Sequence, residues 1–471
     1  MQIIIMKRLY RVAGALVMAL TAMTVAAQDA VPRYVFYFIG DGMGIGPINA
    51  AQRYYSDVLG CDSALTMMQF PVAGMCQTYS ASSSVTDSAA AGTALATGHK
   101  TRNGMLGVTP DSVAVTSMAA LFHDAGYGVG IATSVAPDDA TPGAFYAHVP
   151  HRSMFYEIGC QMAQCGYEFV CGAGLRGTTD SEGHDTGLLK VLDDAGVQIV
   201  RGPQQIADIN SRRVLLLNTE GTVPWNIGYT IDSIADVLTL PQITRTCLNH
   251  LQRTSPDRFF MMVEGGNIDH ALHANDGGTA IIEIINFNEA IKVAYDFYKA
   301  HPDETLIVVT ADHDTGGLAM GNTTVKYDAH LEYFKHQRVS KEAFSDFCKG
   351  IMKSRRVYTW EDMREYLEQS FGLFTVVSVS ADDEQRLRHL FDDTFELRNT
   401  ADQETLYANF NAFAAAVLRL LNDAAGLGYT TLSHTGNPVP VFAIGVGAER
   451  FAAYNNNCCI ANKIISIVTQ Q

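Results

Sequence analysis

The feature of this chain that most constrains its fold is a series of short apolar runs that recur between helix-like segments. Short β-branched or apolar runs are typical of buried strands, and their alternation with helices is typical of a parallel sheet. We therefore predict an α/β fold with three layers, αβα, in which helices cover both faces of a large, mostly parallel central sheet. The predicted strands are 34–39, 72–79, 128–133, 214–217, 259–263, 305–310 and 441–446.

A long, charged, helix-patterned stretch interrupts this alternation between about residues 326 and 430. It includes a helix-start pattern at Thr359-Trp360-Glu361-Asp362 and an alanine-rich run at 412–422. Because another predicted strand follows this stretch, we expect residues 28–471 to form a single domain. Residues 326–430 would be a mainly helical insertion that forms a lid or crown on that domain.

Residues 1–27 have the pattern of a secretory signal peptide, with basic residues at 7–11, an apolar run at 12–25 and small residues before Gln28. The apolar run is shorter than a membrane-spanning helix requires. We therefore expect an exported protein, periplasmic or secreted, with no membrane anchor after signal cleavage. The formal net charge of −16 argues against nucleic acid or an anionic membrane as a partner.

The nine cysteines of an exported chain could form disulfides, although an odd number leaves at least one cysteine unpaired. We expect a local bridge among Cys160, Cys165 and Cys171, whereas the adjacent Cys458 and Cys459 could hardly pair without strain. No two cysteines have CxxC spacing, which argues against a cysteine zinc site.

One serine is placed where a nucleophile could be presented. Asp87 is a strong N-cap residue and the three alanines at 89–91 favour a helix, so Ser88 would lie in the first turn. There, free backbone N–H groups and the helix dipole favour an oxyanion. A capped helix without any chemistry explains this segment equally well by itself.

Acidic and histidine residues follow several predicted strands directly. Asp41, Glu264 and the pair Asp312-His313 each come after such a run, and Thr141 lies in the segment after strand 128–133. Because parallel strands end at the same edge of a sheet, we expect these residues to share one rim. Asp41 lies among glycines, so its alternative interpretation is a turn residue.

The spacing of Asp269 and His273 suggests a metal site. Residues four apart share one face of a helix, and Zn²⁺ accepts their mixture of oxygen and nitrogen ligands. His434 is a third ligand by type, although an isolated histidine is more often structural. Glu264 and Thr141 offer only oxygen atoms, which a hard ion such as Mg²⁺ prefers.

Taken together, these motifs resemble those of the alkaline phosphatase family. The resemblance extends from Asp41 to about Gly447, apart from the insertion, and the motifs occur in family order. They are FIGDGMG at 38–44, VTDSAAAGTA at 85–94, TGHKTRNG at 97–104, DATPGAFYAH at 139–148, Arg152, VEGGNIDHALH at 263–273, VTADHDTGG at 309–317 and SHTG at 433–436.

The resemblance implies a site with two zinc ions and one magnesium ion. It assigns Asp269, His273 and His434 to the first zinc, Asp41, Asp312 and His313 to the second, and Asp41, Thr141 and Glu264 to the magnesium. Asp139 and His270 would lie near the magnesium without binding it. Three divalent ions would outweigh the four ligand carboxylates, so the site would be cationic within an acidic protein.

The implied activity is hydrolysis of small phosphate monoesters to an alcohol and inorganic phosphate, at alkaline pH, through a phosphoserine intermediate. Ser88 would be the nucleophile, Arg152 would bind the phosphate, and Asp87 would anchor the arginine. The resemblance also implies a homodimer.

A phosphodiesterase or sulfatase of the same superfamily is the main alternative, followed by a non-catalytic phosphate- or metal-binding protein. Sulfatases require a C/S-x-P-x-R context, which the string TSPDR at 254–258 does not meet. Diesterases usually have threonine as the nucleophile and lack an equivalent of Arg152. Retention of every reactive residue speaks against a non-catalytic protein.

Overall fold

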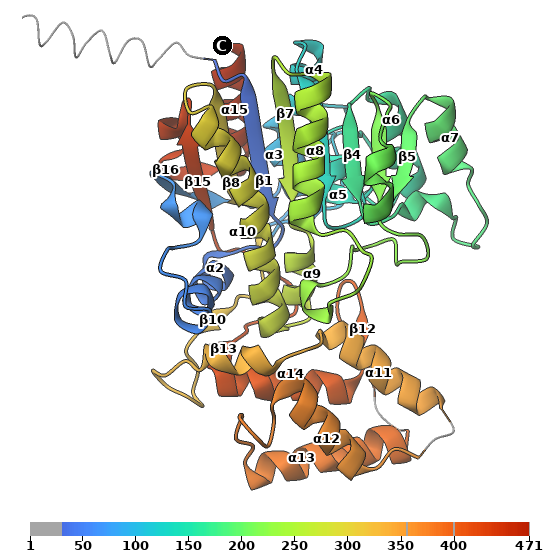
Figure 1. The fold of residues 1–471 in the computed structure, drawn as a ribbon, viewed down its shortest axis with the longest axis vertical. Helices are drawn as coiled ribbons and strands as arrows, with labels where there is room; N and C mark the ends of the chain where they lie inside the picture. The colour runs from blue at the N-terminus through green and yellow to red at the C-terminus, as the bar shows by residue number, and fades with distance from the viewer. Residues whose placement is uncertain (1–30, 355–356, 399–400, 471) are drawn as a thin grey trace, which may run out of the picture.

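The computed structural model describes residues 31–354, 357–398 and 401–470, so the expected signal peptide lies outside the described residues. A ten-stranded sheet lies between layers of helices, which confirms the predicted αβα fold (Figure 1). In sheet order its strands are β16 (Ala453–Asn456), β2 (Val72–Gln77), β15 (Val439–Gly445), β8 (Thr305–Ala311), β1 (Tyr34–Gly40), β7 (Phe259–Glu264), β3 (Gly128–Thr133), β4 (Phe169–Gly172), β6 (Val214–Leu217) and β5 (Gln198–Arg201).

All seven predicted strands belong to this sheet, although β2 ends two residues earlier than expected. The prediction misses β4, β5 and β16, which have four residues each. Such short runs give little periodic signal, and β16 is also polar, with the sequence Ala-Tyr-Asn-Asn. The missed strands therefore lie toward the sheet edges, while the long central strands are predicted correctly.

The central strands β8, β1, β7 and β3 are buried along their whole length. Helices cover both faces of these strands, which explains why they are continuous apolar runs rather than alternating ones. Within this sheet β15 is the strand that runs antiparallel to its neighbours, β8 and β2. Its N-terminal end therefore lies at the edge where the other strands have their carboxyl ends.

Two glycines allow one helix layer to approach the sheet closely. A Cβ atom at Gly128 or Gly130 on β3 would lie 2.4 Å from Ser255 or Cys247, so side chains there would push the adjacent helix away. The helices of the main body are α2 (Ile45–Arg53), α3 (Ser88–Thr97), α4 (Met118–Asp124), α5 (Ala140–Gly143), α6 (Phe155–Gln164), α7 (Leu188–Asp194), α8 (Leu240–Thr254), α9 (Asn267–His273), α10 (Gly277–Ala300) and α15 (Asn457–Thr469).

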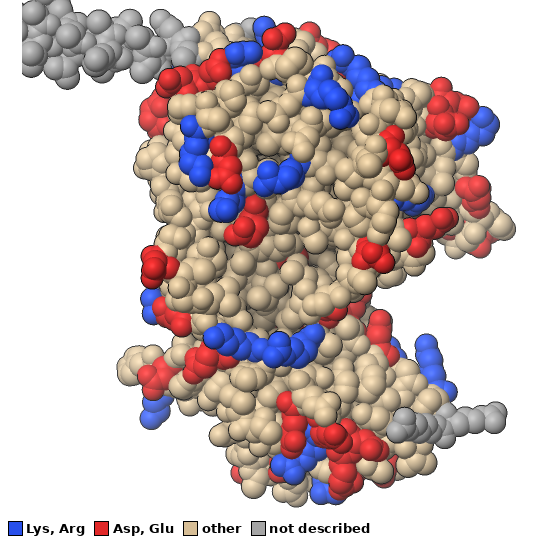
Figure 2. Space-filling view, in the orientation of Figure 1, with Lys and Arg blue, Asp and Glu red and all other residues tan. Residues whose placement is uncertain are grey.

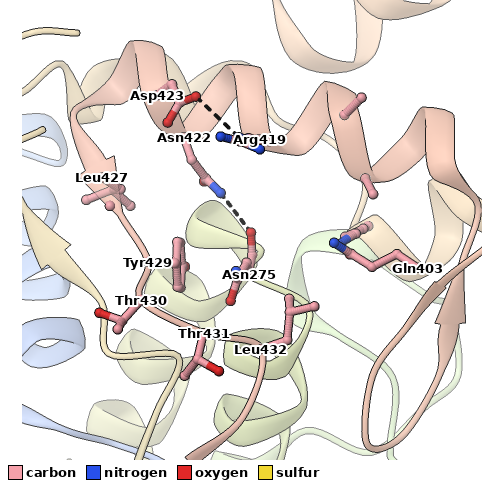
Figure 3. A pocket seen from close by; sticks show the side chains of 14 residues that line it. Asn275, Gln403, Arg419, Asn422, Asp423, Leu427, Tyr429, Thr430, Thr431 and Leu432 are labelled. Carbon is pink, nitrogen blue, oxygen red and sulfur yellow. Dashed lines mark hydrogen bonds and ion pairs between the residues drawn. The ribbon is translucent and has the colours of Figure 1, made fainter. Parts of the chain in front are cut away.

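The stretch expected to be an insertion forms a helical layer beyond the carboxyl ends of the strands, next to α9 (Figure 1). It contains α11 (Lys341–Lys353), α12 (Trp360–Phe371), α13 (Ala381–Phe391), a hairpin of β11 (Gln403–Glu404) and β12 (Asn409–Phe410), and α14 (Ala412–Ala425). The pair β10 (Ala319–Met320) and β13 (Leu427–Gly428) joins its two ends. A cavity of about 570 Å³ lies between α14 and segment 428–432 (Figure 3). The boundaries of the domain and its insertion stay a prediction.

The nine cysteines are all free, so the predicted local bridge is wrong. Cys160 lies on α6 and Cys165 caps its end, and five helical residues rise about 7.5 Å, too far for a disulfide. Cys171 is buried within β4. No described helix is long and apolar enough to cross a bilayer. Figure 2 shows acidic and basic side chains intermixed on one face of the described residues, without a broad basic area.

Candidate metal centre and active site

The residues that follow the strands meet at one edge of the sheet, as their positions in the sequence predict. Asp41 follows β1, Glu264 ends β7, and Asp312 and His313 follow β8. The strands β7, β1 and β8 are neighbours in the sheet, so their ends bring these side chains together. All four residues are buried, and Asp312 and His313 have no exposed surface.

His434 reaches the same edge through a short strand pairing that the sequence does not reveal. It lies on β14 (His434–Thr435), which pairs with β9 (Asp314–Thr315) directly after His313. The His434 ring stacks on the His313 ring with their centroids 3.6 Å apart. A residue more than a hundred positions away is thereby placed beside the acidic cluster.

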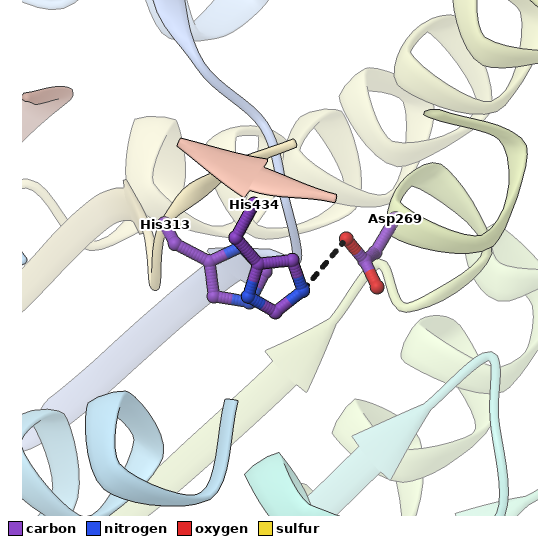
Figure 4. Close-up of side chains that lie close together, drawn as sticks. All are labelled: Asp269, His313 and His434. Atoms are coloured by element: carbon purple, nitrogen blue, oxygen red, sulfur yellow. Dashed lines mark ion pairs between the residues drawn. The ribbon is translucent and has the colours of Figure 1, made fainter. Parts of the chain in front are cut away.

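Two groups of side chains have the geometry of metal sites. Asp269, His313 and His434 form one group, drawn in Figure 4, and Asp41, Asp312 and His313 form the other. Within each group the candidate ligand atoms lie within 4.8 Å of one another. His313 is a member of both groups, and its Nε2 atom lies 3.1 Å from Asp312 Oδ2 and 3.3 Å from Asp41 Oδ1.

His273 lies beside the first group. Its Nε2 atom is 3.4 Å from Asp269 Oδ2 and 3.0 Å from Nε2 of His434. The Nδ1 atoms of His273 and His434 contact the backbone carbonyls of Leu432 and Thr86 at 2.6 and 2.8 Å. These contacts fix the rings with Nε2 facing the cluster, as in histidines that bind a metal ion.

Several oxygen atoms of this buried cluster accept no hydrogen bond from the described part of the chain, although imidazole rings lie close to the carboxylates. Among the described residues no hydrogen bond engages Asp41 Oδ1, Asp269 Oδ2, Asp312 Oδ2 or Thr141 Oγ1, although all are buried. Burial and the neighbouring Asp312 raise the pKa of Asp41 well above its usual value, and burial raises the pKa of Glu264 to about 8. Cations held among these oxygen atoms would satisfy them, so the residues fit a cluster of divalent metal ions.

Ser88 lies at the first position of α3, and Asp87 is the N-cap. Asp87 Oδ1 accepts a hydrogen bond from the backbone N–H of Ala90 at 3.0 Å, which is the cap that the sequence predicts. The Ser88 side chain is buried, and its Oγ lies 3.1 Å from Nε2 of His313. The serine hydroxyl therefore faces the metal-binding cluster from a helix N-terminus.

Two carboxylates hold the Arg152 guanidinium, and one of them is Asp87, the residue next to Ser88. Arg152 Nη2 lies 3.0 Å from Asp139 Oδ1, and Arg152 Nη1 lies 3.6 Å from Asp87 Oδ2. Asp139 also pairs with Arg176 at 3.0 Å. Burial opposes ionisation of Asp139, but the two arginines outweigh it and lower its pKa to about 2. Arg176 lies in no recognisable motif, so its place beside Asp139 could not be predicted from the sequence.

A small cavity connects the remaining predicted residues. Thr141 and Glu264 line it, and so do His270, Arg152 and one tyrosine that the sequence analysis also misses, Tyr407. This tyrosine lies in the β11–β12 hairpin, within residues 326–430, and no motif surrounds it. Asp41, Val135 and Asp139 complete the lining.

Comparisons with known proteins agree with this geometry. The alkaline phosphatase family model matches residues 32–169 and 177–470. Alkaline phosphatase 4 of Bacillus subtilis is 28% identical over 446 residues, which cover 93% of this chain and 88% of that protein. The crystal structure of a cold-active alkaline phosphatase from a psychrophilic Shewanella species superposes with a TM-score of 0.77 and 28% identity, covering 92% of this chain and 99% of that chain.

A further solved structure is a variant alkaline phosphatase of the Antarctic bacterium TAB5 with magnesium bound. Its TM-score is 0.63 at 23% identity, with 94% of this chain and 99% of that chain covered, so it supports the fold. These comparisons do not favour the sulfatase, diesterase or non-catalytic alternatives. Because the family model spans nearly the whole chain, the protein belongs to the alkaline phosphatase family and is an enzyme that hydrolyses phosphate monoesters.

Proposed function

We propose that hydrolysis proceeds through a phosphoserine on Ser88, at alkaline pH, and that small phosphomonoesters are the substrates. The observation that carries this proposal is the position of the Ser88 hydroxyl. It lies at a helix N-terminus, 3.1 Å from His313 Nε2, within a segment whose N-cap also pairs with Arg152. Positive charge and free N–H groups at this point stabilise an attacking oxyanion.

The metal ions of this site are, we propose, two zinc ions and one magnesium ion. The donor sets are Asp269, His273 and His434; Asp41, Asp312 and His313; and Asp41, Thr141 and Glu264. Mixed nitrogen and oxygen donors suit zinc, and the all-oxygen set suits magnesium. The magnesium bound in the TAB5 variant supports the third assignment. When bound, such ions lower the pKa of a hydroxyl and neutralise charge on a phosphoryl group.

The residues of the chain carry out two displacements at phosphorus. Ser88 Oγ forms a bond to phosphorus as the ester oxygen leaves, and water then displaces Oγ to release inorganic phosphate and restore the serine. Arg152 binds two non-bridging oxygens through its planar guanidinium, which Asp87 and Asp139 hold in place. Asp139 and His270 line the cavity next to the magnesium donor set without belonging to it.

Three further features of the proposal concern the whole protein rather than its catalytic residues. The enzyme is exported, either to the periplasm or out of the cell. It functions as a homodimer. Residues 326–430 form a lid or crown over the site, which the contacts of Tyr407 with His270 and His273 support.

Trapping the phosphoenzyme tests this mechanism. Metal-loaded protein is incubated with 4-nitrophenyl phosphate, quenched in acid and analysed by peptide mass spectrometry. We expect phosphate on Ser88, and its loss together with at least about a 1,000-fold decrease in turnover in Ser88→Ala, at unchanged metal content. Phosphate on another residue, or substantial turnover by Ser88→Ala, would refute the serine mechanism. A panel of diesters and sulfate esters tests the substrate class, and monoesters should be hydrolysed fastest.

A further inference from the structure

The β11–β12 hairpin brings one aromatic side chain of residues 326–430 to the metal-binding cluster. The Tyr407 ring packs on His270 with a centroid distance of 4.2 Å and meets the His273 ring edge-on at 5.1 Å. Tyr407 also lines the small cavity that contains Arg152 and Asp41. It therefore forms the side of the site that lies opposite the sheet edge.

The phenol of Tyr407 is available to a ligand. Among the described residues no hydrogen bond is made by its hydroxyl, whereas the ring is held by the two imidazoles. The carboxylates of the cavity are acceptors that the proposed metal ions would engage. The Tyr407 hydroxyl is thus a donor on the same cavity wall as Arg152, together with Thr141, which belongs to the proposed magnesium donor set, and the His270 ring.

The hairpin that carries Tyr407 is tied to the site by a buried lysine. Lys341 Nζ donates to the backbone carbonyl of Ala274, directly after α9, and to Gln403 Oε1 on β11, at 2.7 and 2.5 Å. On the other strand, the Phe410 ring lies under the same ammonium at 4.6 Å. The cavity of Figure 3 borders Lys341 and Gln403, and the contacts of this lysine with the hairpin combine hydrogen bonds with packing on the buried Phe410 ring.

We propose that Tyr407 is a substrate-facing residue whose hydroxyl donates a hydrogen bond to the phosphoryl group bound by Arg152. This inference rests on the proposed function of the same site. The chain thus completes its phosphate pocket with a residue from outside the α/β body. The two imidazoles orient the ring, Lys341 sets the position of the hairpin, and the hydroxyl recognises the oxyanion.

Tyr407→Phe tests the proposal because it removes the hydroxyl and keeps the ring. A hydrogen bond to a charged group contributes enough that its loss should weaken binding of inorganic phosphate about tenfold or more. We expect this change in calorimetric titration of the metal-loaded protein, a similar rise in KM for 4-nitrophenyl phosphate, and unchanged zinc and magnesium content. Leu406→Ala alters the adjacent, 60% exposed residue of the hairpin and should leave all three quantities unchanged.

Three results would overturn the inference. Phosphate affinity of Tyr407→Phe within twofold of the wild type would mean that the hydroxyl does not face the substrate. Loss of magnesium or zinc from Tyr407→Phe would assign the hydroxyl to the metal site. An equal effect of Leu406→Ala would assign the change to the hairpin fold. Absence of monoester hydrolysis by the wild-type enzyme is a different outcome, because it would refute the proposed function itself.

Discussion

The sheet edge and the helical stretch at 326–430 contribute to the same site in different ways. At the sheet edge, buried strands place Asp41, Glu264 and Asp312 directly, and each of these side chains has neighbours from several strands. The helical stretch places one side chain, Tyr407, at the tip of a hairpin tied to α9 through Lys341. The proposed reactive groups thus lie on the α/β body, while the helical stretch supplies a recognition contact.

Among substitutions in the groups that contact the phosphoryl oxygens, the largest effect should come from Arg152, which lies on the α/β body next to the sheet edge. Arg152→Ala removes a paired set of charge-assisted hydrogen bonds, and we expect kcat/KM for a phosphate monoester to fall by about 100-fold or more. A diester offers fewer charged oxygens and should lose less. Arg152→Lys should not restore the rate, since an ammonium cannot copy the planar fork. Steady-state kinetics on both ester classes measure this difference.

The matched control for this substitution is Arg245→Ala, on the exposed side of α8. Arg245→Ala removes one positive charge, as Arg152→Ala does, and should leave the hydrolysis rates of both monoesters and diesters unaltered. Equal losses on monoesters and diesters in Arg152→Ala would contradict a pocket that selects monoesters. A loss smaller than that of Tyr407→Phe would reverse the proposed ranking of the two regions.

The same contrast explains what the sequence predicts and what it does not. Central strands are buried on both faces, so β1, β7 and β8 appear as apolar runs and the polar residues after them must share an edge. The place of His434 depends on the β14–β9 pairing and on the reversed direction of β15, neither of which leaves a local pattern. The place of Tyr407 in the site depends on contacts with side chains far away in the sequence, which residue spacing cannot predict.

A smaller effect should come from the lysine that joins the two regions. Burial lowers the pKa of Lys341 to about 8, although Asp276 opposes the shift. Above pH 8 the folded protein loses this proton while the unfolded chain keeps it up to about pH 10.4. The unfolded state then binds more protons than the folded state. The contribution of Lys341 to the free energy of unfolding therefore rises with pH between about pH 8 and 10.4, by at most about 3 kcal/mol.

Lys341→Met removes the titrating group at similar length. The free energy of unfolding, measured with denaturant between pH 7 and 10.5, should rise in the wild type relative to this variant only above about pH 8. A difference that stays constant across the whole range would show that the ammonium is not destabilised by burial. The contact between the β11–β12 hairpin and the end of α9 would then depend on packing rather than on the charge of Lys341.

The smallest effect should come from the outer helices of the helical stretch, and Thr359 offers a test of them. This residue caps α12: its Oγ1 accepts from Asp362 N at 3.1 Å, and Asp362 Oδ2 accepts from Thr359 N at 2.9 Å. Thr359→Ala should cost about 1 kcal/mol in the free energy of unfolding, and Thr359→Ser, which keeps the cap, should cost much less. Monoester turnover should stay within twofold of the wild type in both variants. A loss of turnover in Thr359→Ala but not in Thr359→Ser would show that order in α12 reaches the Tyr407 hairpin, and the helical layer would then act on the site as a unit rather than through a single side chain.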